Sequence, residues 1–138
     1  MAVRTLNHIN IRTSRLADTV AFYSSVLGMS CKPPPGAKDN SRGTWICDED
    51  GCPVIHVGAR DARYPGDRDE PASDVWGGGA IHHVALECAD YMEMLARLQA
   101  ANLAVTTNEA PHIRLRQLFV QDPNGVTLER NFREAAEA

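Results

Sequence analysis

The residues best suited to chemistry in this chain recur at matching places in its two halves. His8 and His83 each open a segment in which apolar residues alternate with others. His56 follows His8 by 48 positions, and Glu129 follows His83 by 46. Imidazole and carboxylate groups are ligands of Fe, Zn, Ni and Mn, and two histidines with one carboxylate leave coordination positions open for a substrate. His8, His83 and Glu129 are therefore the predicted ligands of one divalent metal ion.

His56 has two interpretations, as a fourth metal ligand or as a base that acts on the substrate. Gly51 precedes His56 by five positions, whereas Gly125 precedes Glu129 by four. A β-bulge adds one residue to a strand, so a bulge would bring His56 into register with Glu129. His56 and Glu129 are the predicted catalytic residues.

Two adjacent histidines, His82 and His83, raise the question of which one belongs to the site. Neighbouring side chains of an extended strand point to opposite faces. His83 aligns with His8 and shares a face with Ala85, whereas His82 falls with Val84 on the side expected to pack under a helix. We therefore expect His83 to be the ligand.

Both halves show the same order of predicted elements. Alternation of apolar and other residues predicts strands, and recurrence every three or four residues predicts helices, with Gly28 and Asn102 at the helix ends. The expected elements are a strand at 6–13, a helix at 15–28 and two strands within 43–59, then a strand at 81–87, a helix at 91–103 and strands at 114–121 and 126–132. Each half is thus β-α-β-β, with room for one further short strand.

The composition is that of one globular domain spanning residues 1–138. Apolar residues make up 43% of the chain, which suffices for a sizeable core at 138 residues. We expect a first module at 1–59, a linker at 60–79 and a second module at 80–133. The polar linker is either a connection or a lid, and its Trp76 either caps a pocket or anchors the linker.

Charge and hydropathy argue against two classes of partner. The net charge is −4 and the 14 basic residues are scattered, so neither nucleic acid nor an anionic membrane is an expected partner. No run of 18 apolar residues occurs, and the first ten residues lack the apolar core of a signal peptide. A cytoplasmic location is expected.

These segments resemble the vicinal oxygen chelate superfamily, which includes glyoxalase I, methylmalonyl-CoA epimerase, extradiol dioxygenases and the fosfomycin and bleomycin resistance proteins. The resemblance covers residues 4–58 and 80–132, through LNHINIRTSRLADTVAFYSSVLGM, HHVALE and RQLFVQDPNGVTLERNF. It implies an α+β fold of two βαβββ modules that form a cupped, mostly antiparallel sheet around a metal site, and it implies a homodimer. The site would lie within one chain or across two.

The resemblance also implies roles for single residues. It assigns His8, His83 and Glu129 to the metal, whereas His56 stands where glyoxalase I carries a glutamate. Arg114 and Arg116 share one face of the predicted strand at 114–121, and with Trp76 they would bind the substrate if that face lines the cup.

The predicted function is that of a metal-dependent enzyme whose small substrate chelates the metal through two neighbouring oxygens. Lyase or isomerase chemistry and ring-cleaving dioxygenation by non-haem iron both fit the ligand set. The alternative is a non-catalytic drug-binding protein of the bleomycin-resistance type. The retained ligand positions count against that alternative.

Overall fold

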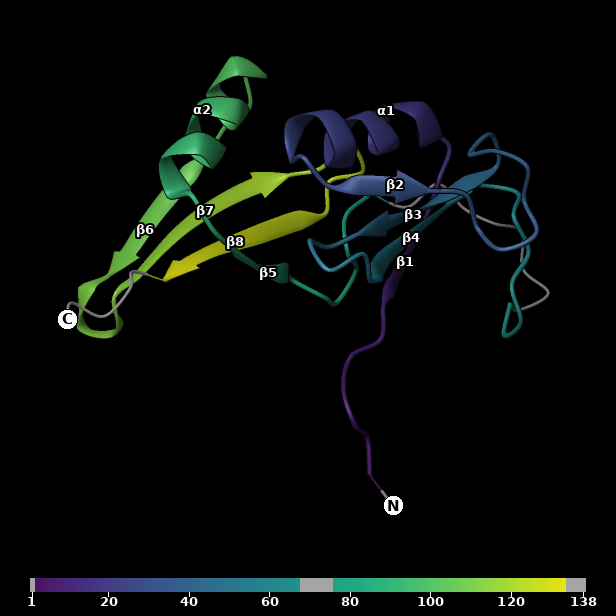
Figure 1. Cartoon of the computed structure of the whole chain (residues 1–138), viewed down its shortest axis with the longest axis horizontal. Helices are drawn as coiled ribbons and strands as arrows, with labels where there is room; N and C mark the ends of the chain where they lie inside the picture. Colours follow the sequence, from purple (N-terminus) through teal and green to yellow (C-terminus); the bar gives the residue numbers. More distant parts are fainter. Residues whose placement is uncertain (1, 68–75, 134–138) are drawn as a thin grey trace. The chain divides into compact units, whose positions relative to one another are not determined.

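A computed structural model of the chain describes residues 2–67 and 76–133. It divides the chain into two compact units, Met1–Asp74 and Val75–Ala138. Each unit contains one four-stranded sheet and one main helix (Figure 1). The predicted α+β class with two βαβββ modules is confirmed. The prediction of one domain with a linker at 60–79 stays a prediction.

The first unit is built on a mixed sheet with the strand order β1-β4-β3-β2. β1 runs parallel to β4, and the other neighbours are antiparallel. Its elements are β1 (Ile9–Thr13), α1 (Leu16–Ala21), the π-helical turn η1 (Phe22–Val26), β2 (Ser30–Lys32), β3 (Gly43–Cys47) and β4 (Pro53–Ala59).

The second unit repeats this topology with the order β5-β8-β7-β6. β5 runs parallel to β8, and the remaining pairs are antiparallel. The further short strands allowed by the sequence are β2 and β6. The elements are β5 (Val84–Cys88), α2 (Tyr91–Ala100), β6 (Thr106–Ala110), the 3₁₀ turn η2 (Pro111–Ile113), β7 (Leu115–Gln121) and β8 (Thr127–Arg133).

One face of each sheet packs against the helix of its own unit. Strand alternation places Ile55 and Val57 of β4 on this face, and both are buried, as are Leu118 and Leu128 in the second sheet. The opposite face, which we call the far face, carries His56 in the first unit and Glu129 in the second. No helix among the described residues is long and apolar enough to cross a membrane.

The first helix departs from its prediction. The α-helix ends at Ala21 and the chain continues as the π-helical turn η1, whose wider turn changes which residues face inward. Thr19 and Phe22 are buried, whereas Val20 between them is only half-buried. Gly28 and Asn102 adopt positive φ after the helices, as predicted, at 76° and 56°.

The turns that precede the last strand of each unit have the same construction. Gly51 N–H donates to the Asp48 carbonyl at 3.0 Å, and Gly125 N–H donates to the Asp122 carbonyl at 3.1 Å. Each aspartate side chain also accepts hydrogen bonds from the backbone N–H groups two and four residues further on. The sequence repeat is therefore a structural repeat down to its hydrogen bonds.

Candidate functional site

Strand register places His56 and Glu129 at equivalent positions of the two modules. His56 lies opposite Asn10 of β1 and Trp45 of β3. Glu129 lies opposite Ala85 of β5 and Phe119 of β7. His8 and His83 stand two residues before Asn10 and Ala85. Each unit therefore carries two residues of the predicted set, one just before its first strand and one in its last strand.

The predicted bulge in β4 exists. Ile46 pairs with Ile55, but Cys47 pairs with Pro53, so β4 holds one extra residue, Val54. No such shift separates β7 from β8. A one-residue slip reverses the face of every side chain, so the bulge turns His56 to the far face.

In the first unit, three aromatic rings form a stack. The ring centroids of His8 and His56 are 3.7 Å apart, and those of Trp45 and His56 are 4.4 Å apart. Burial lowers the pKa of His56, the neighbouring His8 lowers it further, and a hydrogen bond with the Pro53 backbone acts in the opposite direction. His56 is therefore neutral at pH 7, and its buried Nε2 atom has no hydrogen-bond partner within residues 2–67 and 76–133.

The stacked arrangement of His8 and His56 also limits how they can bind a metal. A ligand lone pair lies in the plane of its imidazole ring, and these two planes are only 14° from parallel. One ion cannot lie in two parallel planes, so joint ligation requires one ring to turn. His8 is the exposed partner, and its Nδ1 contacts Asn7 Oδ1 at 2.6 Å, which leaves Nε2 for an ion.

In the second unit, His83 lies beside Glu129. His83 Nε2 is 3.8 Å from Glu129 Oε1. β5 begins only at Val84, so the strand alternation used to separate His82 from His83 does not reach them. Their Nδ1 atoms are 2.9 Å apart, and the expectation that His82 packs under a helix is wrong because its side chain is exposed.

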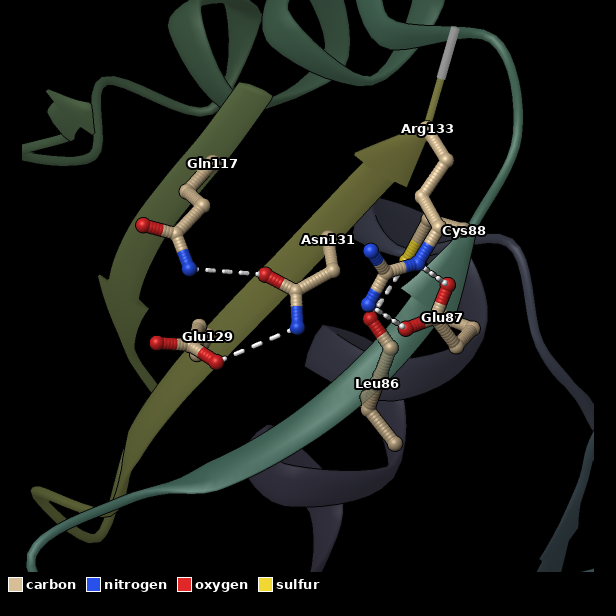
Figure 2. A network of polar contacts seen from close by, with 7 residues as sticks. All are labelled: Leu86, Glu87, Cys88, Gln117, Glu129, Asn131 and Arg133. Carbon is tan, nitrogen blue, oxygen red and sulfur yellow. Dashed lines mark hydrogen bonds and ion pairs between the residues drawn. The ribbon is translucent and has the colours of Figure 1, made fainter. Parts of the chain in front are cut away.

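Glu129 differs from the other glutamate on the far face, Glu87. The Glu129 side chain is 16% exposed, and its Oε2 accepts a hydrogen bond from Asn131 Nδ2 at 3.1 Å. The Glu87 side chain is 64% exposed and binds Arg133 through both carboxylate oxygens, each at 3.3 Å (Figure 2). Of these two carboxylates, the more buried one is thus the one that has no arginine partner in the described part of the chain.

The two pairs fit a metal ion in the chemistry of their donor atoms. Within residues 2–67 and 76–133, no cluster of three or more His, Cys, Asp or Glu side chains could hold an ion by itself. Each unit instead supplies two donors, and the orphaned Nε2 of His56 and the Glu129 carboxylate are groups that a cation would satisfy. Their ligand role stays a prediction.

A pocket of about 450 Å³ lies on the far face of the first unit, at His56. Trp45 and Asn10 form part of its floor, and Lys38, Arg42 and Tyr64 are among the residues of its walls. The two loops that form these walls carry no sequence pattern that would predict the pocket.

Tyr64 is held against the sheet by its own segment. A side chain at Gly58 would collide with the Tyr64 hydroxyl, so the glycine admits the ring. Arg12 lies over the Tyr64 ring at 4.9 Å and donates to Asp67 Oδ1 at 2.6 Å. The segment that follows β4 is thereby fixed over the far face.

The predicted pairing of Arg114 and Arg116 on one site-facing strand is not observed. Arg114 lies in the turn before β7, with φ of 52°. Arg116 lies on the helix side of the sheet, 3.7 Å from the centre of the Tyr91 ring, and pairs with Glu109 at 3.4 Å. Arg116 therefore faces away from Glu129, since alternation puts Gln117 and Phe119 on the far face.

Trp76 lies against the turn before β8. Its ring occupies the space that a side chain at Gly125 would need, and the neighbouring Gly77 N–H donates to the Asn124 carbonyl at 2.7 Å. The Trp76 side chain is nevertheless 62% exposed. This position fits the anchoring interpretation, and a substrate contact by Trp76 stays a prediction.

Asn131 and Gln117 are neighbours of the candidate ligand Glu129 that the sequence reasoning missed. Gln117 Nε2 donates to Asn131 Oδ1 at 2.9 Å, and Asn131 in turn donates to Glu129 (Figure 2). A signal was available, because Asn131 stands two positions after Glu129 and so shares its face of the strand.

Comparison with known proteins agrees with the resemblance found in the sequence. Among curated proteins, none matches this chain in sequence. Solved structures match its fold at low identity, which shows the fold alone. A glyoxalase/dioxygenase from Nostoc punctiforme matches with a TM-score of 0.67 and 15% identity, over 96% of this chain and 92% of that chain.

Two further solved structures belong to proteins with different named roles. Lactoylglutathione lyase from Agrobacterium tumefaciens matches with a TM-score of 0.61 and 16% identity, over 91% of each chain. TnmS3, an antibiotic binding protein from Streptomyces sp. CB03234, matches with a TM-score of 0.64 and 20% identity, over 97% of this chain and 99% of that chain. The fold therefore occurs in a lyase and in a binding protein.

A family model settles the membership. It matches residues 5–129, which is most of the chain, and it spans both modules and all four residues of the predicted ligand set. The chain belongs to the glyoxalase/bleomycin resistance protein/dioxygenase superfamily.

Proposed function

We propose that this protein is a metal-dependent enzyme whose small substrate binds a divalent ion through two neighbouring oxygen atoms. The proposed ligands are His8, His83 and Glu129, and His56 is either a fourth ligand or the base. Fe, Zn, Ni and Mn all suit such a set. The observation that carries the proposal is the environment of Glu129.

Within residues 2–67 and 76–133, Glu129 has no lysine or arginine partner, although its side chain is only 16% exposed. An ionised carboxylate removed from water is unfavourable unless it is paired or bound to a metal. Glu129 is mostly buried, and its neighbours are the neutral amide of Asn131 and the ring of His83. A bound divalent ion would supply the missing positive charge, and His83 Nε2 is close enough to share it.

His56 supports the same conclusion from the first unit. A buried imidazole nitrogen without a hydrogen bond is unfavourable, by about 1–3 kcal/mol. The low pKa of His56 keeps the ring neutral, which is the state that a metal ligand or a base needs. Nε2, the buried nitrogen that has no hydrogen-bond partner among the described residues, is the atom proposed to bind the ion or take the proton.

The proposed chemistry follows from these groups. The ion, when bound, would polarise a substrate carbonyl or bring oxygen next to a ring substrate. In a lyase or isomerase, His56 Nε2 would take the proton from the carbon beside the carbonyl. The pocket at His56 would hold the substrate, with Lys38 offering positive charge to its oxygens. In a ring-cleaving dioxygenase, His8, His83 and Glu129 would form the facial set of ligands.

Elemental analysis of protein purified without chelator tests this proposal. We expect about one transition metal ion per chain in the wild type and its loss in His83→Ala and Glu129→Ala. Glu87→Ala is the matched control, because it removes a glutamate from the same face that already has Arg133 as partner. Iron would favour dioxygenation, and zinc, nickel or manganese would favour a lyase or isomerase.

The second candidate is a drug-binding protein without catalysis. The pocket of the first unit favours it, because Trp45 and Tyr64 give that pocket aromatic walls without any need for a metal. The likeness to TnmS3 points the same way. A wild-type protein that is metal-free and cannot be loaded with metal would make this the better account.

A further inference from the structure

A row of three amide side chains crosses the far face of the second sheet and ends on Glu129. Strand pairing sets Asn108 opposite Gln117, and Gln117 opposite Asn131. Asn108 Nδ2 donates to Gln117 Oε1 at 2.8 Å, and Gln117 Nε2 donates to Asn131 Oδ1 at 2.9 Å. The last link runs from Asn131 Nδ2 to Glu129 Oε2 at 3.1 Å (Figure 2). We call Asn108, Gln117 and Asn131 the amide row.

The carboxylate at its end sets the direction of the amide row. An ionised glutamate only accepts hydrogen bonds, so Asn131 must turn its NH₂ group toward Glu129. Its carbonyl then faces Gln117, which must present its own NH₂ group, and the same reasoning extends to Asn108. All three amides therefore point their donors toward Glu129, and such aligned hydrogen bonds reinforce one another.

A neighbouring ion pair favours this choice of partner for Asn131. The residue opposite Asn131 on β5 is Glu87, a second carboxylate that could accept from it. Arg133 occupies both oxygens of Glu87. Asn131, which is 8% exposed, donates instead to Glu129 on its own strand.

We propose that the amide row positions Glu129 as a metal ligand, an inference that rests on the metal site proposed above. Asn131 holds Oε2, so Oε1, the oxygen nearer His83, is the atom left for the ion. Gln117 is a positioning residue that keeps Asn131 in its donating orientation. Removal of hydrogen bonds that orient a ligand typically weakens metal binding 10–100-fold.

The substitution Gln117→Glu separates this role from simple electrostatics. The new carboxylate cannot donate to Asn131 Oδ1, so the Asn131 amide turns its NH₂ group toward β7 and its oxygen toward Glu129. Metal binding then weakens because Glu129 loses its donor and faces a carbonyl. Coulomb attraction alone predicts the opposite, since an added negative charge near the site strengthens cation binding.

Gln121→Glu is the matched control. Phe119 lies opposite Glu129, and Gln117 and Gln121 stand two residues to either side of it on the same face of β7. Both substitutions therefore add the same charge at similar positions relative to Glu129. Of the side chains that the structure describes, only Gln117 donates to Asn131 Oδ1, so only Gln117→Glu reverses the amide row.

The test is a Co²⁺ titration of the full chain after removal of bound metal, followed by visible absorption. We expect the Co²⁺ dissociation constant to rise about 10-fold in Gln117→Glu and in Asn131→Leu, and to stay within about 2-fold or fall in Gln121→Glu. Circular dichroism of the metal-free variants checks folding. If Gln117→Glu does not fold, the Co²⁺ dissociation constant of Asn131→Leu tests the inference.

Two results would overturn the inference in different ways. If Glu129→Ala abolishes Co²⁺ binding while Gln117→Glu and Asn131→Leu bind as tightly as the wild type, the amide row has no positioning role and the metal site stands. If Glu129→Ala binds Co²⁺ like the wild type, the metal site itself is wrong and the inference fails with it.

Discussion

At the scale of single residues, the candidate site is defined by how its charges are balanced. Two acids that hold strands and loops in place have an arginine partner, as Glu87 has Arg133 and Asp67 has Arg12. Glu129 is more buried than Glu87 and has a neutral amide as donor instead. This contrast between carboxylates separates the residue proposed for metal binding from those that hold the fold.

Asp67 gives a pH-dependent prediction at this scale. The Tyr64 backbone N–H and, after it, the Arg12 side chain hold the pKa of Asp67 below its usual range. Because the folded pKa is the lower one, the stabilisation is complete above the unfolded aspartate pKa of about 3.9 and is lost as pH falls through the folded value. We expect an NMR titration of the Tyr64 amide to show its midpoint below 3.9.

Arg12→Met separates the two causes of this shift. The midpoint should rise but stay below the usual value, because the Tyr64 hydrogen bond is the larger cause. A midpoint at the ordinary aspartate value in Arg12→Met would show that the hydrogen bond to Tyr64 does not contribute.

At the scale of elements, the turn before the last strand has the same construction in both modules, but its surroundings differ. Gly51 and Gly125 both have positive φ, at 80° and 77°. No described atom lies within 4 Å of a Cβ placed at Gly51, whereas one at Gly125 would collide with the Trp76 ring. The second turn is thus covered by the segment that enters its unit.

The substitutions Gly51→Ala and Gly125→Ala are therefore a matched pair. Each forces alanine into a left-handed conformation, which costs about 1–2 kcal/mol. Gly125→Ala also displaces Trp76, and overpacking of this kind adds about 1–3 kcal/mol. Urea denaturation should show a larger loss in the free energy of unfolding for Gly125→Ala, and equal losses would mean that Trp76 does not pack on the turn.

The sequence predicted the order of the elements because their periods are local properties. Alternation in β4 and β8 and the left-handed residues Gly28 and Asn102 were visible without any tertiary information. The π-helical turn after Ala21 was not visible, since it depends on how the helix meets its sheet. The predicted starts of β1 and β5 were too early. Pairing with a neighbouring strand, and not alternation, decides where these strands begin.

The candidate site, like the fold, could be predicted from the sequence only in part. Residue type and the repeat pointed to His8, His56, His83 and Glu129, and the register shift in β4 confirmed the predicted bulge. The face of Arg116 could not be predicted, because parity alone does not tell which side of a sheet a helix covers. The amide row could not be predicted either, since it depends on which residues of three strands lie opposite one another.

At the scale of the whole molecule, the two modules divide the proposed ligand set equally. His8 and His56 belong to the first unit, and His83 and Glu129 to the second. Two donors are too few for a catalytic transition-metal site, which commonly uses three protein ligands. The central claim is therefore that donors from both modules bind the same ion.

The most direct test of this claim is the number of Co²⁺ ions that each chain binds, measured for the wild type, His8→Ala and Glu129→Ala. One variant lies in each module. We predict one ion per chain in the wild type, and its loss in both variants. Two ions per chain, or one ion that survives in His8→Ala, would show that the modules do not share a metal and would contradict the account.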